Sequence, residues 1–155
     1  MSVRSRYWDA CAFLGLLRAE EDKREECRKV IAEARSGKFM IVTSTLTLAE
    51  VLWLKGKDPI PEADREKVRK FFRHAWVRMR ELDRAIAEEA QEVVWKHSVR
   101  PKDAVHVATA LRSTVEQLDT FDADLIGLSG KIGSPPLAIG RPNVEGMLFA
   151  PDVDA

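Results

Sequence analysis

Apolar positions recur along this chain with two periods, which predict strands and helices in alternation. Short runs rich in β-branched and aromatic residues, as in residues 39–44, are typical of buried strands. Longer segments with apolar residues three or four positions apart, as in residues 83–97, are typical of amphipathic helices. Strands are predicted at 3–8, 39–44, 76–82 and 115–120. Helices are predicted at 10–19, 20–38, 45–56, 62–75, 83–97 and 101–113, with a turn and a short helix at 121–128.

Three local signals mark the ends of these helices. Gly37 ends the second predicted helix, because glycine readily takes the backbone conformation that follows a last turn. Asp83 is a candidate N-cap for the helix that follows it. Pro101 opens the next helix at a first-turn position, where its missing N–H is not needed.

The alternation of strands and helices predicts an α/β fold with a mainly parallel sheet, because parallel strands need crossover connections. At 155 residues the chain is long enough to bury a core. We therefore expect one domain over residues 1–155, with a core at about 3–127 and a C-terminal arm at 128–155. The arm is rich in Gly and Pro, holds a candidate edge strand at 136–139, and is expected to fray at its final PDVDA.

The composition excludes several classes of protein. Apolar residues make up 45% and charged residues 32% of the chain, which argues against global disorder. No apolar run approaches the roughly 20 residues that cross a bilayer, so no membrane association is expected. Asp9 interrupts the apolar N-terminal stretch, so a signal peptide is not predicted and the expected compartment is the cytoplasm. Cys11 and Cys27 are too few for a disulfide framework.

The formal net charge is zero, from 25 basic and 25 acidic side chains. A nucleic-acid partner must therefore meet a local basic patch rather than the field of the whole molecule. Residues 65–80 are one candidate, because basic and aromatic side chains interleave there. The alternative is a solvated helix whose aromatic residues enter the core or a dimer interface. Arg100 and Lys102 are better placed, because they lie beside Asp103.

Four acidic residues stand where a predicted strand passes into a helix or loop: Asp9, Glu50, Asp103 and Asp122. Their neighbours are apolar or small, and an unpaired carboxylate is expensive to bury in such a setting. The carboxyl ends of parallel strands gather at one edge of a sheet, so all four side chains can face one crevice.

Clustered carboxylates are typical ligands of a hard divalent cation, which promotes phosphodiester hydrolysis without a Cys or His nucleophile. Each acid also has a structural explanation. Asp9 can cap the following helix, and Thr47 and Glu50 have the spacing of a capping box. Asp103 can complement a helix dipole, and Asp122 can be a turn residue. The four acids together favour a metal site over these separate explanations.

Several segments resemble the PIN-domain nucleases, and among them the VapC-type toxins of prokaryotic toxin–antitoxin pairs. They are YWDACAFLGLL, TSTLTLAEVL, LDRAIAEEAQEV, RPKDAVHVATAL and LDTFDADL. The resemblance covers roughly residues 3–127. It implies a PIN-like three-layer α/β/α fold with a mainly parallel central sheet, RNA cleavage that depends on Mg²⁺ or Mn²⁺, and frequent dimerisation.

By this resemblance the family's four acids fall on Asp9, Glu50, Asp103 and Asp122, the candidate catalytic residues and metal ligands. Candidate supporting or substrate-binding residues around them are Ser44, Thr120, Lys102, Arg100 and His106. For His106, a hydrogen-bonded structural role is the alternative.

The sequence also departs from the family's pattern. Cys11 stands where Ser or Asn is commoner, and Ala10 replaces a frequent Thr, so fewer polar groups surround the first acid. Asp119 and Asp124 flank Asp122 and are alternatives for the fourth acid.

The sequence therefore predicts a metal-dependent endoribonuclease that is the toxin of a type II toxin–antitoxin pair. Mg²⁺ or Mn²⁺ is the expected cofactor, and RNA, a small antitoxin protein and a second copy of the chain are the expected partners. Two alternatives stay open: a housekeeping PIN ribonuclease without an antitoxin, and a non-catalytic PIN-like module that binds RNA or protein. The four acids argue against the second alternative, because an inactive site has no need for clustered charge.

Overall fold

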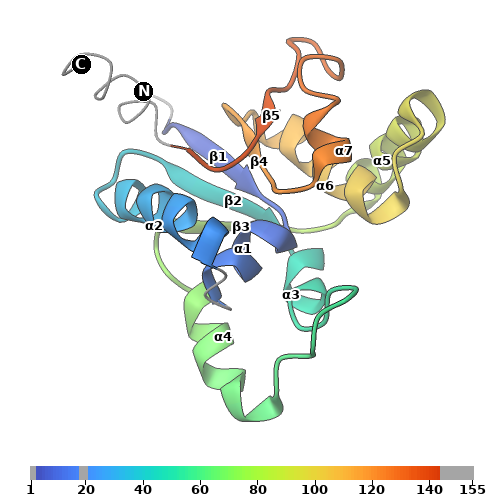
Figure 1. The fold of residues 1–155 in the computed structure, drawn as a ribbon. Coiled ribbons are helices and arrows are strands. Elements are labelled where there is room, and N and C mark those ends of the chain that lie inside the picture. Colours follow the sequence, from blue (N-terminus) through green and yellow to red (C-terminus); the bar gives the residue numbers. More distant parts are fainter. Residues whose placement is uncertain (1–2, 18–20, 144–155) are drawn as a thin grey trace.

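Five parallel strands form the centre of the protein in a computed structural model that describes residues 3–17 and 21–143 (Figure 1). The strands are β1 (Ser5–Trp8), β2 (Met40–Ser44), β3 (Val77–Arg80), β4 (Leu118–Asp119) and β5 (Ile139–Gly140). Their order across the sheet is β3-β2-β1-β4-β5, and every pairing is parallel. The predicted α/β fold with a mainly parallel sheet is confirmed. Because β1 is central, the residue that follows it lies between the ends of β2 and β4.

Helices cover both faces of this sheet, which gives the predicted three-layer α/β/α arrangement. They are α1 (Ala10–Leu17), α2 (Glu21–Arg35), α3 (Leu46–Glu50), α4 (Arg65–Phe72), α5 (Arg84–His97), α6 (Pro101–Ser113) and α7 (Ala123–Ile126), with a 3₁₀ helix η1 (Glu62–Asp64). Among the described residues, no helix is long and apolar enough to cross a membrane.

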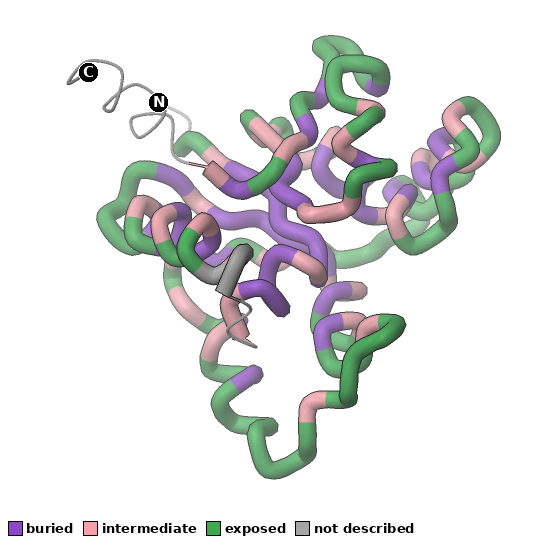
Figure 2. The backbone as a smooth tube through the Cα atoms, viewed as in Figure 1, coloured by how far each residue is buried: buried purple, intermediate pink, exposed green. Residues whose placement is uncertain are grey.

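The core has two apolar layers, one on each face of the sheet. Tyr7 belongs to the layer under α5 and α6, whereas Trp8 belongs to the layer under α1, α2 and α4. Successive residues of a strand point to opposite faces, so these two neighbours divide between the layers. Figure 2 shows the buried backbone concentrated along the strands and the inner sides of the helices. The strand ends are thereby held by packing from both sides.

The predicted helix boundaries agree with the structure at three points. Asp83 caps α5 by accepting a hydrogen bond from the Ile86 backbone N–H at 2.9 Å. Pro101 is the first residue of α6. Gly37, just after α2, has a φ of 86°, a left-handed conformation that favours glycine. These signals succeed because each depends on the backbone geometry of a single residue.

The helix expected at 45–56 is the main difference between prediction and structure. α3 ends at Glu50, and residues 51–60 form turns and irregular chain instead. Leu52 and Trp53 are exposed by 41% and 71%, so a longer helix would lack an apolar surface against which to pack. The capping box is also wrong, because the N-cap is Thr45 and the Thr45 side chain makes no capping hydrogen bond.

Two smaller predictions concern the basic segment and the C-terminal arm. The aromatic residues of 65–80 enter the core, since Phe72 is buried and Phe71 packs edge-to-face on Phe13. This favours the solvated-helix alternative for that segment. β5 (Ile139–Gly140) pairs with β4 at the edge of the sheet, so the arm does supply an edge strand, which begins at the last residue of the predicted 136–139 segment. The terminal PDVDA lies outside the described residues.

Candidate functional site

Asp9 follows the central strand and lies almost fully buried at the amino end of α1. Its Oδ1 accepts a hydrogen bond from the Ala12 backbone N–H at 3.1 Å, and its Oδ2 accepts one from the Thr120 hydroxyl at 2.6 Å. Burial raises the pKa of Asp9; His106 and the two hydrogen bonds oppose this, and the Glu50 carboxylate adds to it. Asp9 therefore caps α1 and is also electrostatically coupled to another of the four acids.

Thr120 links two of the candidate acids from its buried position after β4. Its hydroxyl donates to Asp9 and accepts a hydrogen bond from the Asp122 backbone N–H at 3.1 Å. Asp122 in turn caps α7, because its Oδ1 accepts from the Asp124 and Leu125 backbone N–H groups at 2.9 and 3.3 Å. One hydroxyl thus ties together the ends of two neighbouring strands, and with them two carboxylates.

Asp103 lies in the first turn of α6 and is partly buried. Burial raises its pKa, and the carboxylates of Asp122, Asp9 and Glu50 raise it further, while His106 lowers it. Asp103 is therefore influenced by all three of the other predicted acids, although the four come from separate segments of the chain. Asp103 and Asp122 also line one pocket of about 240 Å³.

Glu50 is held by a buried histidine from another element. The His106 Nε2 atom lies 2.5 Å from the Glu50 Oε1 atom, and the His106 Nδ1 atom lies 2.6 Å from the Tyr7 hydroxyl. Tyr7 and His106 are 0% and 1% exposed. The three side chains thus form a hydrogen-bonded chain from the core to the site.

The direction of these hydrogen bonds follows from the chemistry of the three groups. Burial and, to a smaller extent, the Asp9 carboxylate raise the pKa of Tyr7, so its hydroxyl keeps its proton and can donate to the histidine Nδ1 atom. A carboxylate only accepts, so the Nε2 atom must carry the proton that binds Glu50. The Nε2 atom of His106 thus donates to Glu50, and its Nδ1 atom is hydrogen-bonded to the Tyr7 hydroxyl.

The other predicted residues differ in their positions. Ser44 is buried at the end of β2, where its hydroxyl accepts a hydrogen bond from the Leu46 backbone N–H at 3.1 Å and so supports the start of α3. Arg100 and Lys102 are both exposed at the amino end of α6, but only Arg100 lines the pocket with Asp103. Ser44 is thus a structural support, and Arg100 is the nearer cation to the acids.

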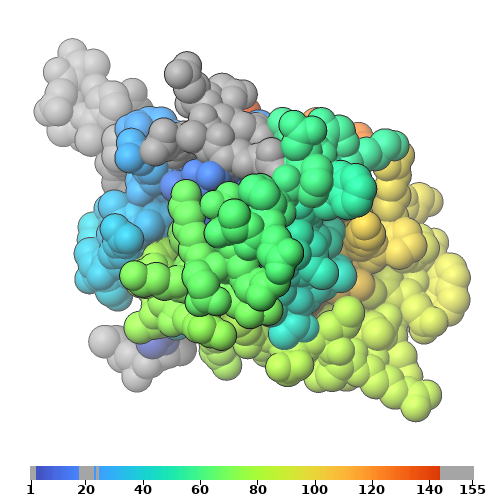
Figure 3. Space-filling model, turned by 90° about the horizontal axis from the view of Figure 1, so that it is seen from below, coloured from blue at the N-terminus to red at the C-terminus, as the bar shows by residue number. Residues whose placement is uncertain are grey.

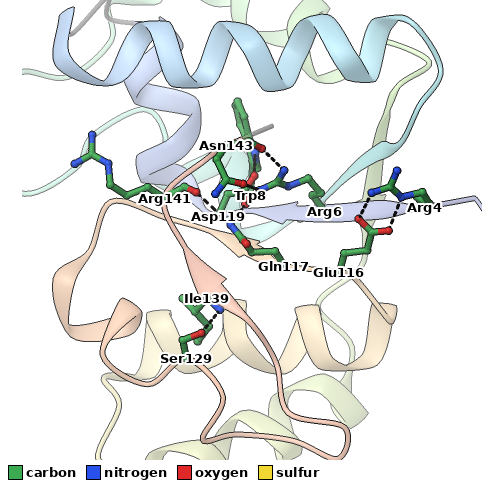
Figure 4. A network of polar contacts seen from close by, with 10 residues as sticks. All are labelled: Arg4, Arg6, Trp8, Glu116, Gln117, Asp119, Ser129, Ile139, Arg141 and Asn143. Carbon is green, nitrogen blue, oxygen red and sulfur yellow. Dashed lines mark hydrogen bonds and ion pairs between the residues drawn. The ribbon is translucent and has the colours of Figure 1, made fainter. Parts of the chain in front are cut away.

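Asp119, one alternative for the fourth acid, belongs to a separate buried network (Figure 4). Its carboxylate accepts hydrogen bonds from Arg6 at 2.7 Å, Trp8 Nε1 at 2.8 Å and Gln117 at 2.8 Å. Burial raises the pKa of Asp119 to about 6, although the Arg6 guanidinium lowers it. Its oxygens are therefore already committed to other partners. Asp124, the second alternative, is exposed at the rim of the pocket.

Cys11 lies near the acids, and their charges affect the pKa of its thiol. Burial raises its pKa to about 12, and Asp9, Asp122 and Asp103 raise it in that order, while Lys23 lowers it. A thiol with this pKa is not a nucleophile at neutral pH. Cys11 is therefore not a candidate nucleophile, and three of the four acids contribute negative charge around it.

The donor set fits a hard divalent cation, because it consists of carboxylate oxygens with mutual repulsion that a cation would relieve. Within residues 3–17 and 21–143, no three acidic, His or Cys side chains form a ready-made metal cage. Mg²⁺ usually keeps several waters and uses one or two carboxylates together with substrate phosphates, so it does not need such a cage. The residues present are compatible with Mg²⁺ or Mn²⁺.

Comparison with known families and structures gives the same fold. The PIN domain family matches residues 6–131, which is most of the chain. The chain therefore belongs to the PIN domain family. No curated protein sequence matches it.

Three solved structures share the fold at low sequence identity. The toxin VapC20 of Mycobacterium tuberculosis, described as cleaving the sarcin–ricin loop, is 18% identical, with a TM-score of 0.60 over 77% of this chain and 91% of that one. A toxin–antitoxin complex from Klebsiella pneumoniae is 17% identical, with a TM-score of 0.58 over 81% and 93%. VapBC2 from Rickettsia felis, bound to a promoter DNA fragment, is 13% identical, with a TM-score of 0.62 over 87% and 96%.

Sequence reasoning missed the part that Tyr7 plays in the site. Tyr7 contacts His106 across 99 positions of sequence, and a tyrosine in a predicted strand is ordinarily a core residue. One signal was present, because Tyr7 and Asp9 are two residues apart around the end of a strand. Only the packing of α6 on the sheet shows that the hydroxyl meets a histidine.

Proposed function

We propose that this protein is a metal-dependent endoribonuclease. The observation that supports it most is the convergence of Asp9, Glu50, Asp103 and Asp122 at the carboxyl edge of the parallel sheet, where they act on one another electrostatically. Folded proteins rarely keep several partly buried carboxylates together without a function, since their charges repel and burial is unfavourable.

Asp9, Glu50 and Asp103 would hold the Mg²⁺ or Mn²⁺ ion, with Asp122 completing the site directly or through water. When bound, the ion supplies Lewis-acid activation of water and charge neutralisation at the phosphate. Thr120 fixes the Asp9 carboxylate, and Tyr7–His106 fixes that of Glu50. These hydrogen bonds hold two acids in place before substrate arrives, which lowers the reorganisation needed during reaction.

The biological role that we propose is the toxin of a type II toxin–antitoxin pair. The support is a PIN fold shared with VapC20 and with two toxin–antitoxin complexes. The housekeeping ribonuclease remains the second candidate. Expression of the chain alone should slow host growth, and the Asp103→Asn variant should relieve it; equal toxicity of both would count against the toxin role.

An exposed apolar groove supports a protein partner for this toxin. It has a volume of about 490 Å³ and runs between residues 48–60 and the helices η1 and α4, on the face shown in Figure 3. Leu48 and Leu52 line it and are exposed by 42% and 41%. Such a surface suits an apolar segment of a small antitoxin. A second copy of this chain is the other expected partner, and sedimentation of the purified protein tests for the homodimer.

Cleavage of a pooled RNA library tests the enzymatic proposal. The protein is incubated with Mg²⁺, with Mn²⁺ or with excess chelator, and the new RNA ends are mapped. We expect cleavage at defined positions with either metal and none in chelator. Equal cleavage in chelator would show that the activity does not depend on a divalent ion, and no cleavage under any condition would favour the non-catalytic alternative.

A further inference from the structure

Two cationic side chains flank the ring of Phe121. The Lys23 Nζ atom lies 5.3 Å from the ring centroid, and the Arg141 Cζ atom lies 4.9 Å from it. The three residues come from α2, from the segment after β5 and from the loop after β4, so only the fold brings them together. Cations at these distances from an aromatic ring are attracted by its quadrupole. Phe121 is thus a contact that the two cations share.

This arrangement is built into the backbone around it. A Cβ atom at Gly15 would lie 3.2 Å from the Lys23 Cβ atom and 3.3 Å from the Phe121 ring, so the absence of a side chain there leaves room for both. The Arg141 Nε atom forms an ion pair with Glu26 on α2 at 3.0 Å, and the Arg141 carbonyl accepts a hydrogen bond from Gln117 at 3.1 Å. Figure 4 shows the Arg141 side chain extending away from the Asp119 network.

The two cations lie beside the acidic site. Phe121 stands between Thr120, which binds Asp9, and Asp122. Lys23 and Phe121 pack beside Gly15 of α1, the helix that Asp9 caps. The Thr120 backbone N–H donates to the Gly140 carbonyl at 2.9 Å, so Arg141 directly follows the residue that is paired with Thr120. Arg100 lines the pocket on the side of α6. The cations nearest to the acids are therefore Arg100 from α6 and the Lys23–Arg141 pair from α2 and the segment after β5.

An RNA strand meets an electrostatic difficulty at this site, because its phosphates are repelled by the clustered carboxylates. The chain has no net positive charge that would offset the repulsion. Cations beside the acids must therefore hold the phosphates that flank the reacting one. Lys and Arg are suited to this, the first as a compact charge and the second as a planar donor of several hydrogen bonds.

We propose that Lys23 and Arg141, which both contact Phe121, form a subsite that binds the backbone phosphate of single-stranded RNA next to the cleavage position. The subsite rests on the proposed ribonuclease function and adds the path of the substrate to it. Phe121 is a positioning residue, since its ring holds the two cations rather than stacking on a base. Arg141 lies beyond the 6–131 stretch that matches the PIN domain family, so the C-terminal arm contributes to the site.

Equilibrium binding of RNA in chelator isolates this subsite from catalysis. A fluorescein-labelled single-stranded RNA of mixed sequence is titrated with the full chain at several KCl concentrations, and its anisotropy is followed. The test variants are Lys23→Gln and Arg141→Gln. The controls are Lys38→Gln and Arg112→Gln, which remove exposed charges at the far ends of α2 and α6. Thermal melts confirm that each variant is folded.

We expect each test variant to bind about three to ten times more weakly than wild type. The slope of log K against log salt should become less steep by about 0.7 for each lost contact with single-stranded RNA. The control variants should match wild type in both respects. The Arg141→Lys variant keeps the positive charge and should retain most of the affinity. Comparing it with Arg141→Gln separates the effect of the lost charge from the effect of the changed side-chain shape.

Two results overturn the proposal in different ways. If wild type binds RNA with a marked salt dependence and both test variants behave like the controls, the subsite is wrong while the ribonuclease function stands. If wild type neither binds nor cleaves RNA, the proposed function fails and the subsite fails with it. A further readout is steady-state cleavage in Mg²⁺, in which loss of the subsite should raise KM and leave kcat nearly unchanged.

Discussion

The hydrogen-bonded chain from Tyr7 through His106 to Glu50 makes the Tyr7→Phe variant informative. The change removes one oxygen atom and leaves the aromatic ring in the core, where Tyr7 is fully buried. The His106 Nδ1 atom, now 2.6 Å from the hydroxyl, would lose that partner inside the protein. His106 would still lie within hydrogen-bonding distance of Glu50, but nothing would fix the orientation and tautomer of its ring.

The size of the effect follows from the burial of the three groups. A buried polar atom left without a partner costs about 1–3 kcal/mol, and the apolar area of the ring does not change. We therefore expect the free energy of unfolding to fall by about 1–3 kcal/mol. At about 2–4 °C per kcal/mol for a domain of this size, Tm should fall by about 2–12 °C.

Urea unfolding gives the stability, and NMR of the histidine ring nitrogens gives the mechanism. Wild type should show a proton on the His106 Nε2 atom, and the variant should show altered His106 signals. The chain has three histidines, so His74 and His97 serve as internal controls that should not change. A double-mutant cycle with Glu50→Gln should give a coupling energy of at least about 0.5 kcal/mol through the shared histidine.

Two outcomes would refute this reasoning. Unfolding free energies that agree within about 0.5 kcal/mol would mean that the hydroxyl is not a needed partner of His106. Unchanged His106 signals in Tyr7→Phe would mean that the phenol does not set the tautomer, and the support of Glu50 would then need another explanation.

Three further predictions concern the acids. In chelator, the Asp103→Asn variant should melt a few degrees above wild type, because the change removes repulsion between carboxylates. Mg²⁺ should raise the melting point of wild type more than that of the variant. Equal Mg²⁺ shifts of the two melting points, measured by calorimetry, would contradict a metal role. The pKa values of Asp9 and Asp103 are raised in the folded state, so the folded protein binds more protons than the unfolded chain. The free energy of unfolding in chelator should therefore decrease as pH rises through those pKa values. Urea unfolding across pH checks the sign, and this decrease should be smaller in the Asp103→Asn variant. The Asp119→Asn variant should lose about 3–5 kcal/mol of stability, because the change leaves the Arg6 charge buried without its anion. Its Mg²⁺ affinity, measured by calorimetry, should equal that of wild type. Loss of that affinity would show that Asp119 is a metal ligand.

The parts of the fold that the sequence predicted correctly are those that depend on local geometry. Asp9 and Asp103 could be placed because one follows a strand with clear β-branched and aromatic character and the other follows a proline that opens a helix. Parallel strands have their carboxyl ends at one edge, so the convergence of the acids followed from the order of the elements. The extension of α3 beyond Glu50 was wrong because helical spacing alone does not show that Leu52 and Trp53 lack a packing surface.

The contacts that support the site could not be predicted, because they join distant parts of the chain. Whether Tyr7 meets a histidine depends on how α6 crosses the sheet, and hydrophobic periodicity does not define that crossing. Lys23 and Arg141 are 118 positions apart, and neither belongs to a segment that resembles a known motif. Asp119 and Asp122 could not be distinguished by position, since only the structure shows the first bound to Arg6.

The central claim is that the clustered carboxylates perform metal-dependent RNA cleavage, and the single-turnover rate of Asp9→Asn tests it most directly. Asn keeps the volume of Asp and can still accept one of the hydrogen bonds from Ala12 and Thr120, so the fold should persist. The charge that would hold the cation is lost. We predict that cleavage of a mapped RNA in Mg²⁺ slows by at least about 100-fold, the scale of losing a key electrostatic group. A variant that is folded by circular dichroism and cleaves within about twofold of the wild-type rate would contradict the account.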